Sequence, residues 1–494
     1  MNMNPMLLTD FYKIGHRVQY PQGTELIYST FTPRASRIIG VDKVVFFGLQ
    51  GFIKEYLIEY FVDNFFNKNI NDIVKDYKRI ISLTLGVEDP ATDHIEALHK
   101  LGYLPIKICA VDEGTKLPIR VPMFTIENTH PDFFWVTNFL ETFMSSELWK
   151  PTTVATITEL YREICDEWSN KTCDNNEHVK FQCHNFSMRG LSGFSDLLTN
   201  GMAHLTRFVG TDTIPAIIYA EKYYNSNIEN ELVGCSIPAS EHSVQCTYGN
   251  DYKYFSDMIN KIYPTGLVSI VSDGYDYWEM LTEVIPSLRD DILSRDGKVV
   301  VRPDSGDPVD IICGYNDIDL GMACTPEEKG SIELLWDEFG GTINDKGYKV
   351  LDSHIGLIYG DAITPERANE IFKRLERKGF AASNVVFGVG SYSLGFHTRD
   401  TFGMALKSTY AVVDGEEKLI FKDPKTDSGV KKSQKGLVVI LKDSVTGEIG
   451  FIDNLTRNAK DSYKDSDLLK PVFIDGKLLV DDSLETIRTR LGGI

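Results

Sequence analysis

The segment LVSIVSD, residues Leu267–Asp273, is a short apolar run that ends in a polar residue, and KVVVRPD, residues Lys298–Asp304, repeats this pattern. Five further segments have the same form: HNFSMRG (184–190), RFVGTD (207–212), GCSIPAS (234–240), IGLIYGD (355–361) and NVVFGVG (384–390). Short apolar strands that alternate with helices are typical of a parallel sheet or barrel. We therefore expect an α/β fold with a TIM-like irregular α/β barrel, whose polar strand ends gather at one face.

One of the helices between these strands is specified residue by residue. Thr364 suits the N-cap, Pro365 the first helical position and Glu366 the positive end of the helix. Gly379 can terminate the helix. One face has apolar residues at helical spacing, which we expect to be core: Ala368, Ile371, Phe372 and Leu375.

The two ends of the chain predict a second, α+β domain. Helical patterns occupy residues 9–16, 46–99, 131–149 and 153–168, and residues 102–127 alternate like an antiparallel sheet. After about residue 403 the pattern becomes antiparallel hairpins, which we expect to return to the N-terminal sheet. The expected parts are an N-terminal α+β part at 1–150, a catalytic barrel at 151–402 and a β-rich C-terminal segment at 403–494.

The composition of the 494 residues limits the partners. Lys and Arg number 51 and Asp and Glu 71, so the formal net charge is -20. Such a surface disfavours binding to nucleic acid or anionic membranes, and cations for a phosphorylated substrate must be gathered locally. The eight cysteines show no CxxC or zinc spacing and predict reduced thiols. With no signal sequence and no membrane-spanning apolar run, we expect a cytoplasmic protein with no membrane partner.

Glu241 and His242 end the segment GCSIPASEHS, residues 234–243, and place a charge beside a titratable imidazole. A histidine next to a carboxylate is more often structural than catalytic. Asp273, Asp304 and Asp361 end other strands in the same way, however, and this repetition favours a functional interpretation.

The mouth of the predicted barrel would combine both signs of charge. Carboxylates there can hold ribose hydroxyls and Mg²⁺, and guanidinium groups can bind phosphate in a bidentate manner. Backbone amides beside Gly360, Gly388 and Gly390 can approach a phosphate closely. The glycines match no Rossmann fingerprint, and there is no Walker sequence. These residue types predict a sugar-phosphate site formed by Arg189, Asp212, Glu241, His242, Asp273, Arg302, Asp304 and Asp361.

Nine motifs, taken as an ordered set, resemble the nicotinamide phosphoribosyltransferases, which are type II phosphoribosyltransferases. They are LLTDFYK (7–13), HNFSMRG (184–190), GTDT (210–213), SIPASEHS (236–243), SDGYD (272–276), RPDSGDP (302–308), YGD (359–361), TRD (398–400) and FKDP (421–424). The resemblance extends over nearly the whole chain. It implies a pentosyltransferase of NAD salvage that joins nicotinamide to 5-phosphoribosyl 1-diphosphate, giving nicotinamide mononucleotide and diphosphate. It also implies a homodimer with shared active sites.

The resemblance assigns the pyridine ring to Phe186 and to the partner's Tyr12, whose flat aromatic faces suit that role. Asp212 would accept a hydrogen bond from the carboxamide NH₂ and repel nicotinate, and Arg302 would meet the carbonyl side or the diphosphate. By the same resemblance the ribose belongs to Asp304, Gly360 and Asp361, and the 5′-phosphate to Gly390, Ser391, Arg399 and Lys407. The diphosphate belongs to Arg34, Arg189, Lys422 and Lys431.

The implied chemistry is displacement at the anomeric carbon through an oxocarbenium-like transition state, with diphosphate as the leaving group. The catalytic set would be His242, Glu241, Asp273 and Asp304. His242 would be phosphorylated from ATP, and the phosphohistidine would recruit Mg²⁺ beside Glu241 and Asp273, the expected metal ligands. ATP hydrolysis would thus be coupled to synthesis without being stoichiometrically required.

Two features of the sequence depart from the family pattern, and other functions therefore remain open. The usual GSGGG is GVGSY at 388–392, and Ala405 replaces a serine that usually precedes the phosphate-binding lysine, so phosphate contacts would differ. A nicotinate phosphoribosyltransferase is the nearest alternative, which Asp212 disfavours. A catalytically silent nucleotide-binding protein on the same scaffold and a generic barrel sugar-phosphate enzyme are the others.

Overall fold

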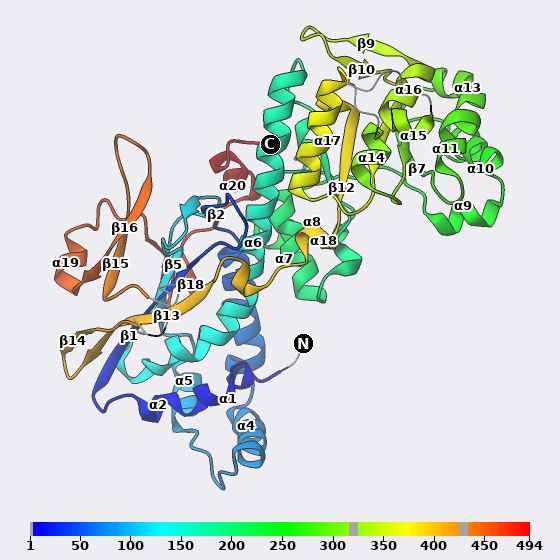
Figure 1. Ribbon diagram of the computed structural model, residues 1–494. Coiled ribbons are helices and arrows are strands. Elements are labelled where there is room, and N and C mark those ends of the chain that lie inside the picture. The colour runs from blue at the N-terminus through cyan, green and yellow to red at the C-terminus, as the bar shows by residue number, and fades with distance from the viewer. Residues whose placement is uncertain (1–2, 316–324, 423–425, 427–432) are drawn as a thin grey trace. The chain divides into compact units, whose positions relative to one another are not determined.

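The computed structural model describes residues 3–315, 325–422, 426 and 433–494 and consists of two compact units, whose elements are labelled in Figure 1. Unit 1 comprises Met1–Thr156, Ala220–Ser226 and His397–Gly492. Unit 2 comprises Ile157–Tyr219, Asn227–Phe396 and Gly493–Ile494. Unit 1 therefore combines an N-terminal part of the chain, a C-terminal part that ends at Gly492 and one short internal segment.

Unit 2 is built around five parallel strands in the order β6-β12-β11-β8-β7. They are β6 (Cys183–Asn185), β7 (Val268–Val271), β8 (Val299–Arg302), β11 (Ile355–Tyr359) and β12 (Val385–Val389). Single parallel bridges continue the ring from β6 to β7: Asn185↔Thr211, Gly210↔Cys235 and Ala239↔Ser269. Segments 207–212 and 234–240 therefore close the sheet, and the seven predicted strands follow one another around an irregular barrel. The predicted fold class is confirmed.

Part of the irregularity of the barrel has a local cause in segment 234–240. Pro238 has no N–H to donate to a ladder, and its carbonyl oxygen accepts from Ser269 N at 2.8 Å. A strand with such a residue pairs through single bridges rather than through a continuous ladder. The regular strands are mostly apolar because they are largely buried on both faces, as shown by Ile270, Val301 and Phe387, each 0% exposed.

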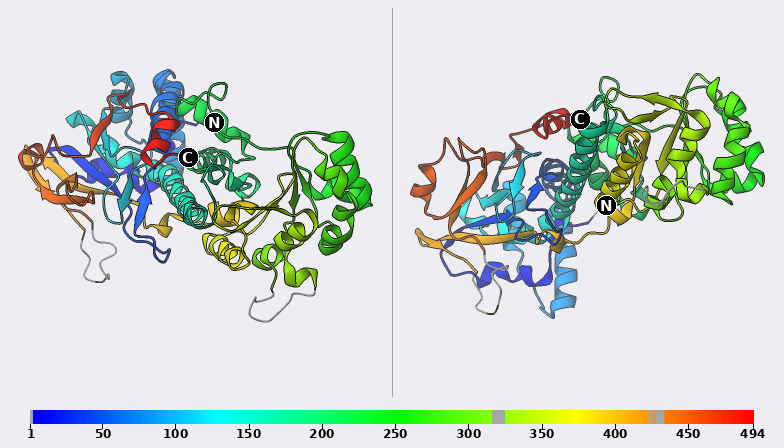
Figure 2. Two further views of the ribbon diagram at one scale, coloured as in Figure 1. Left: turned by 90° about the horizontal axis from the view of Figure 1, so that it is seen from above. Right: turned by 45° about the horizontal axis from the view of Figure 1, so that its top comes forward.

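Helices connect the barrel strands, and the two views of Figure 2 show them, in green and yellow, beside the parallel strands. They are α7 (Phe194–Leu205), α8 (Ile214–Tyr223), α9 (His242–Tyr248), α10 (Asp251–Asp257), α11 (Tyr277–Glu279), α12 (Ile285–Ser287), α13 (Arg289–Leu293), α14 (Pro308–Cys313), α15 (Pro326–Lys329), α16 (Ser331–Phe339), α17 (Pro365–Arg377) and α18 (Ser391–Leu394). A small hairpin consists of β9 (Gly341–Ile343) and β10 (Lys349–Leu351).

Helix α17 forms as its sequence predicts. The Thr364 side chain accepts a hydrogen bond from the backbone N–H of Arg367 at 3.2 Å. The four apolar residues of the predicted face are buried, and the ring of Phe372 lies 4.9 Å from that of Phe387 in β12. Gly379 follows the helix with a φ of 77°, a conformation that glycine adopts without steric cost.

Unit 1 contains an antiparallel sheet that combines the two ends of the chain. Its order is β14-β13-β1-β5-β3-β17-β18, and Figure 2 shows the blue, cyan and orange strands together. The strands are β1 (Thr24–Thr32), β3 (Ile106–Ala110), β5 (Phe124–Asn128), β13 (Ala405–Val413), β14 (Glu416–Leu419), β17 (Lys470–Ile474) and β18 (Lys477–Leu478). The predicted return of the C-terminal segment to the N-terminal sheet is confirmed by the pairing of β1 with β13.

Smaller elements complete unit 1. Two further antiparallel pairs are β2 (Lys43–Val45) with β4 (Lys116–Pro118), and β15 (Leu437–Lys442) with β16 (Ile449–Leu455). The helices are α1 (Phe11–Ile14), α2 (His16–Gln19), α3 (Leu49–Phe52), α4 (Ile70–Leu85), α5 (Asp93–Leu101), α19 (Arg457–Asp461) and α20 (Leu484–Arg490). Residues 53–60 and 62–66 form π-helical turns between α3 and α4.

The two helices predicted at 131–149 and 153–168 are in fact one helix, α6 (Trp135–Thr172), with Pro151 inside it. The prediction was wrong because tertiary packing overrides the helix-breaking tendency of proline. Thr152 Oγ1 donates to Phe47 O at 2.9 Å, and a Cβ at Gly48 would lie 2.7 Å from the Pro151 ring, so Gly48 makes room for it. Neither α6 nor another helix of the described residues is long and apolar enough to cross a membrane.

The N-cap of α17 offers a test of this fold. Thr364→Ala leaves the Arg367 N–H without its side-chain acceptor, so we expect a loss of about 1 kcal/mol in the free energy of unfolding. Urea denaturation followed by circular dichroism measures it. Thr282→Ala is the control: Thr282 is exposed and donates to Trp278 O within a helix, so the change should stay within about 0.5 kcal/mol. Equal losses in both variants would contradict the assignment.

Candidate active site

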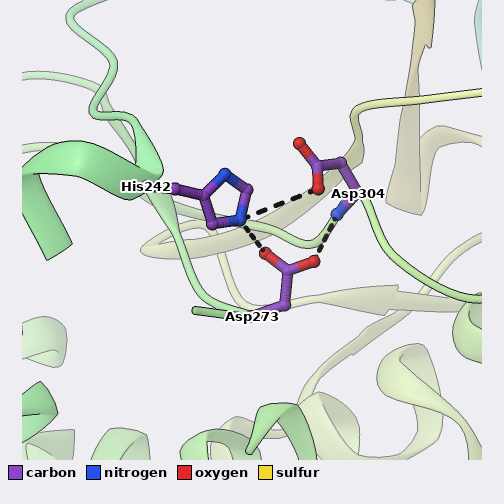
Figure 3. A group of neighbouring side chains, drawn as sticks. All are labelled: His242, Asp273 and Asp304. Atoms are coloured by element: carbon purple, nitrogen blue, oxygen red, sulfur yellow. Dashed lines mark hydrogen bonds and ion pairs between the residues drawn. The ribbon is translucent and has the colours of Figure 1, made fainter. Parts of the chain in front are cut away.

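His242, Asp273 and Asp304 meet at one place in unit 2, although 62 positions separate the first from the last (Figure 3). His242 Nε2 lies 2.9 Å from Asp273 Oδ1 and 3.7 Å from Asp304 Oδ1. His242 begins α9 after segment 234–240, Asp273 follows β7, and Asp304 follows β8. The carboxyl ends of parallel strands share one edge of the barrel, which explains why residues that end three separate strands come together.

The carboxylate of Asp273 accepts four hydrogen bonds. Its Oδ2 accepts from the backbone N–H groups of Asp304 and Ser305, each at 2.9 Å, and from Ser305 Oγ at 2.6 Å, while its Oδ1 accepts from His242 Nε2. The side chain is only 2% exposed. Burial raises the pKa of Asp273, but the hydrogen bonds from Ser305, Asp304 and His242 outweigh burial, and the net pKa is lowered. Asp273 therefore stays ionised and orients the imidazole.

Asp304 has the opposite electrostatic balance. Burial and the neighbouring charge of Asp273 raise the pKa of Asp304, and the opposing effects of His242 and Arg302 are smaller. Two carboxylates this close do not ionise independently, so a cation between them would lower the pKa of Asp304. Asp304 is thus the member of the group whose charge responds most directly to a bound ion.

Within the described residues, one group of carboxylates and imidazoles is close enough to share a metal ion. It consists of His242, Asp273 and Asp304, whose ligand atoms lie within 4.8 Å of one another. Carboxylate oxygens suit Mg²⁺, so Asp273 and Asp304 fit such an ion. Glu241, the other predicted ligand, lies outside this group, and its Oε1 accepts a hydrogen bond from Ser243 Oγ.

A second group lies at the ends of β6 and segment 207–212. His184 and Phe186 are two positions apart on an extended segment and share a face, with ring centroids 4.7 Å apart. His184 Nε2 donates to Asp212 Oδ1 at 2.8 Å, and Ser236 Oγ donates to the same oxygen at 2.7 Å. Burial raises the pKa of Asp212, but these two hydrogen bonds and the Arg302 charge prevail and lower the net pKa.

Arg302 lies between these two groups. Its guanidinium carbon is 6.0 Å from the centroid of the Phe186 ring, within cation–π range, and its NH2 donates to Ser240 O. A Cβ at Gly388 would lie 2.6 Å from Phe186 Cδ2, so the missing side chain of Gly388 makes room for the ring. Phe186 is therefore held between the Gly388 backbone and the charge of Arg302.

The other predicted residues of unit 2 lie next to this group. A Cβ at Gly360 would lie 3.1 Å from Asp304 Cβ, and one at Gly390 would lie 3.9 Å from Asp361 Oδ1. Asp361 is therefore near the N-terminus of α18, whose first residue is Ser391. A Cβ at Gly190, next to Arg189, would meet Ser391 Oγ at 2.0 Å. The structure thus brings together ten of the twelve predicted site residues that belong to unit 2. Of the other two, Glu241 accepts from Ser243, and Arg189 is next to Gly190, which lies against Ser391.

Five predicted site residues in the described part of the chain belong to unit 1. Two of them are neighbours there: Arg34 Nε donates to Gly403 O at 2.9 Å, and the Met404 N–H donates to Arg399 O at 3.0 Å. Lys407 pairs with Thr30 in the sheet. These three cations therefore lie on adjoining segments of unit 1.

The remaining predicted residues of unit 1 are exposed or outside the described part. Tyr12 is 60% exposed, and its ring makes an edge contact with His16 at 5.0 Å. The backbone N–H of Lys422 donates to Ser433 Oγ at 2.9 Å. Lys431 lies outside the described residues.

Sequence reasoning missed three residues that hold the predicted ones in place. Ser305 anchors Asp273, and His184 and Ser236 anchor Asp212. All three stand within the motifs RPDSGDP, HNFSMRG and SIPASEHS. The alternation of side chains along HNF already predicts that His184 and Phe186 point to the same side of the strand. The acceptors, Asp212 and Asp273, lie on other strands, so only the fold reveals these hydrogen bonds.

Comparison with known proteins gives the same class as the site. The nicotinate phosphoribosyltransferase (NAPRTase) family matches residues 181–476, and the nicotinamide phosphoribosyltransferase N-terminal domain matches residues 4–108. Fold, site and family together define an enzyme of the phosphoribosyltransferase class. By its full-length relatives the chain belongs to the nicotinamide phosphoribosyltransferase family.

Two of these relatives cover nearly the whole chain. The nicotinamide phosphoribosyltransferase of Acinetobacter baylyi is 47% identical over 502 residues, which cover 99% of this chain and 97% of that protein. The enzyme of the same name from Xanthomonas campestris is 34% identical over 493 residues, which cover 98% and 97%.

Solved structures share the fold at low sequence identity. Nicotinate-nucleotide pyrophosphorylase from Pyrococcus furiosus aligns with a TM-score of 0.56 and 14% identity over 99% of this chain and 94% of that one. Human nicotinic acid phosphoribosyltransferase aligns with a TM-score of 0.52 and 14% identity, over 98% and 93%. These similarities support the two-part α/β architecture.

The four hydrogen bonds to Asp273 generate a prediction about stability. Asp273→Asn places an NH₂ group among three donors or beside His242, so we expect a loss of about 2 kcal/mol in the free energy of unfolding at pH 7. The folded-state pKa of Asp273 is lowered, so its contribution is complete above the ordinary aspartate pKa of about 3.9 and is lost as the pH falls through the folded value. The wild-type advantage should therefore shrink in acid. Denaturant titrations from pH 7 to pH 3 measure it.

The matched control for this variant is Asp307→Asn, in the loop after β8 that also carries Asp304 and Ser305. Asp307 caps α14 by accepting from the backbone N–H of Val309, and asparagine caps helices equally well. This change should cost little at any pH. A pH-independent loss in Asp273→Asn would contradict the role assigned to its charge.

Proposed function

We propose that this protein transfers the phosphoribosyl group of 5-phosphoribosyl 1-diphosphate to nicotinamide, giving nicotinamide mononucleotide and diphosphate in NAD salvage. The observation that carries the proposal is that His184 contacts both the ring of Phe186 and the carboxylate of Asp212, whose pKa is lowered. An aromatic face and a carboxylate are complementary to a flat pyridine that bears an NH₂ donor. The full-length relatives, which are named nicotinamide phosphoribosyltransferases, support the same substrate.

Asp212 favours the amide over the acid for an electrostatic reason. Its carboxylate can accept from the carboxamide NH₂, whereas nicotinate would bring a second negative charge to the same place. Arg302, whose guanidinium lies 6.0 Å from the Phe186 ring centroid, is available for the carbonyl side or the diphosphate. We propose that the partner's Tyr12 covers the other face of the pyridine.

The sugar and its phosphates are assigned to the remaining residues. Asp304, Gly360 and Asp361 would hold the ribose hydroxyls. The 5′-phosphate would be bound by Gly390, Ser391, Arg399 and Lys407, and the diphosphate by Arg34, Arg189, Lys422 and Lys431. We also propose a homodimer that shares its active sites, in which some of these cations come from the partner chain. A cytoplasmic location stays a prediction.

His242 would accept a phosphoryl group from ATP. Its Nε2–H donates to Asp273 Oδ1 at 2.9 Å, which leaves the lone pair on Nδ1, and Figure 3 shows Nδ1 directed away from both aspartates. Nδ1 would attack the γ-phosphorus as the bond to ADP breaks, and Asp273 would stabilise the resulting imidazolium. Mg²⁺ held by Asp273 and Asp304 would offset negative charge on phosphate and on the leaving diphosphate; Glu241 stays a predicted ligand.

A nicotinate phosphoribosyltransferase is the alternative, since that family's model matches residues 181–476. The charge of Asp212 disfavours it. A non-catalytic nucleotide-binding protein would lack diphosphate release. Incubation of the enzyme with 5-phosphoribosyl 1-diphosphate and either nicotinamide or nicotinate, with and without ATP, separates the three. We expect diphosphate release with nicotinamide, stimulated by ATP and Mg²⁺.

Asp212→Ser should relax the choice between amide and acid. Loss of the carboxylate removes one charge-assisted hydrogen bond, so KM for nicotinamide should rise about tenfold, and nicotinate should become a substrate because its repulsion is lost. Steady-state kinetics with each base measure both effects. Asp352→Ser is the control, because Asp352 pairs with His354 at 2.6 Å before β11 begins, at the other end of the strands. If nicotinate still fails as a substrate, repulsion by Asp212 is not the filter.

His242→Ala should abolish the stimulation by ATP but leave a slow, ATP-independent transferase, since the phosphohistidine assists bond exchange without performing it. The rate of nicotinamide mononucleotide formation with and without ATP measures the effect, and radiolabel from γ-labelled ATP should be absent from the variant. His354→Ala should retain both stimulation and label. Stimulation that survives in His242→Ala would contradict the role of this residue.

A further inference from the structure

We propose that His184 is a positioning residue which, with Ser236, holds the carboxylate of Asp212 in place and thereby sets the preference for a carboxamide over a carboxylate. The inference rests on the function proposed above and extends it to residues that do not themselves need to contact the substrate.

The two donors converge on a single oxygen. His184 Nε2 and Ser236 Oγ donate to Asp212 Oδ1 at 2.8 and 2.7 Å. Two hydrogen bonds to one oxygen fix the rotation of the carboxylate. They leave the other oxygen, Oδ2, oriented to accept a hydrogen bond from a further donor. The side chain of His184 is 12% exposed and that of Asp212 is 44% exposed. A largely buried donor thus holds an acceptor that remains accessible to a ligand.

The imidazole of His184 is itself fixed by its surroundings. A Cβ at Gly210 would lie 2.9 Å from His184 Nδ1, so the ring occupies the space that a side chain at position 210 would fill. The Phe186 ring packs on its other side, with centroids 4.7 Å apart and planes inclined by 43°. His184 therefore contacts both groups assigned to nicotinamide, the aromatic wall and the carboxylate.

The backbone holds the same group in register. Asp212 N donates to Asn185 O at 3.0 Å, and Asn185 N donates to Gly210 O at 3.0 Å. Residues 184 and 212 are thus attached to adjacent extended segments that cannot slide independently. A rigid pair of strands maintains a hydrogen bond between side chains far better than two loops would.

The donors also determine the charge of Asp212. Burial alone would raise the pKa of this carboxyl, and the opposing groups that face it are His184, Ser236 and Arg302. Without His184 the carboxylate would lose its strongest donor and bind a proton more readily. A carboxylate that is free to rotate directs less of its charge at nicotinate and is a poorer acceptor for the amide NH₂.

The test compares His184→Ala with His184→Gln in the full chain. Alanine removes the donor, whereas glutamine returns an N–H at about the position of Nε2. In His184→Ala we expect KM for nicotinamide to rise about tenfold, and the ratio of kcat/KM for nicotinamide to that for nicotinate to fall about tenfold. KM for 5-phosphoribosyl 1-diphosphate should stay within about twofold. His184→Gln should recover most of both losses.

A matched control separates positioning from general damage. His354→Ala removes a histidine from another His–Asp pair of the same unit, with Asp352 Oδ1 at 2.6 Å from Nδ1, and should leave both readouts unchanged. If His184→Ala does not fold, Ser236→Ala at an exposed position should move the same two readouts in the same direction by about fivefold.

The outcomes distinguish the two proposals. If the wild-type enzyme does not use nicotinamide, the proposed function fails, and this inference fails with it. If the wild type uses nicotinamide but His184→Ala and Ser236→Ala keep its KM and selectivity, only the positioning role is overturned. Equal losses for nicotinamide and 5-phosphoribosyl 1-diphosphate, without recovery in His184→Gln, would also overturn it, because a merely structural role moves both substrates.

Discussion

The carboxylate of Asp273 is the interaction on which the site depends. One buried side chain accepts from the backbone of Asp304 and Ser305, from the Ser305 hydroxyl and from His242, and so joins the ends of β7, β8 and segment 234–240. An ionised group in this position can persist only because its donors outweigh the cost of burial. The same four bonds that keep Asp273 charged also fix the imidazole and the turn that carries Asp304, so stability and catalytic geometry share one cause.

A comparable arrangement holds Asp212, which we propose binds the carboxamide of the pyridine. His184 and Ser236 donate to Asp212 and lower its pKa against the effect of burial, and Phe186 lies where the absent side chain of Gly388 leaves room. In both places an aspartate at a strand end is held by donors from a neighbouring strand end. The barrel thus provides fixed charges that would need little reorganisation on binding of the proposed sugar phosphate, which is the general advantage of a preorganised site.

The strand ends were predictable because apolar runs and the polar residues that follow them are local features. Parallel strands place their carboxyl ends together, so the sequence alone predicts that His242, Asp273 and Asp304 lie at one edge of the barrel. The position of the Glu241 side chain relative to the predicted metal ligands does not follow from the order of the strands. Its side chain accepts from Ser243 in the structure, a local contact that the pattern of residue types does not reveal.

Sequence by itself determined the barrel, the α17 helix with its cap, the return of the C-terminal strands and the family, because each rests on short-range periodicity or on ordered motifs. Tertiary structure alone decided that α6 continues through Pro151, that Ala220–Ser226 belong to unit 1, and that His184, Ser236 and Ser305 hold the aspartates. The physical reason is common to all three. Each of these features depends on partners that are distant in the chain: the residues packed around Pro151, the contacts of Ala220–Ser226 and the aspartates that accept from the three donors. Residue type does not identify such partners.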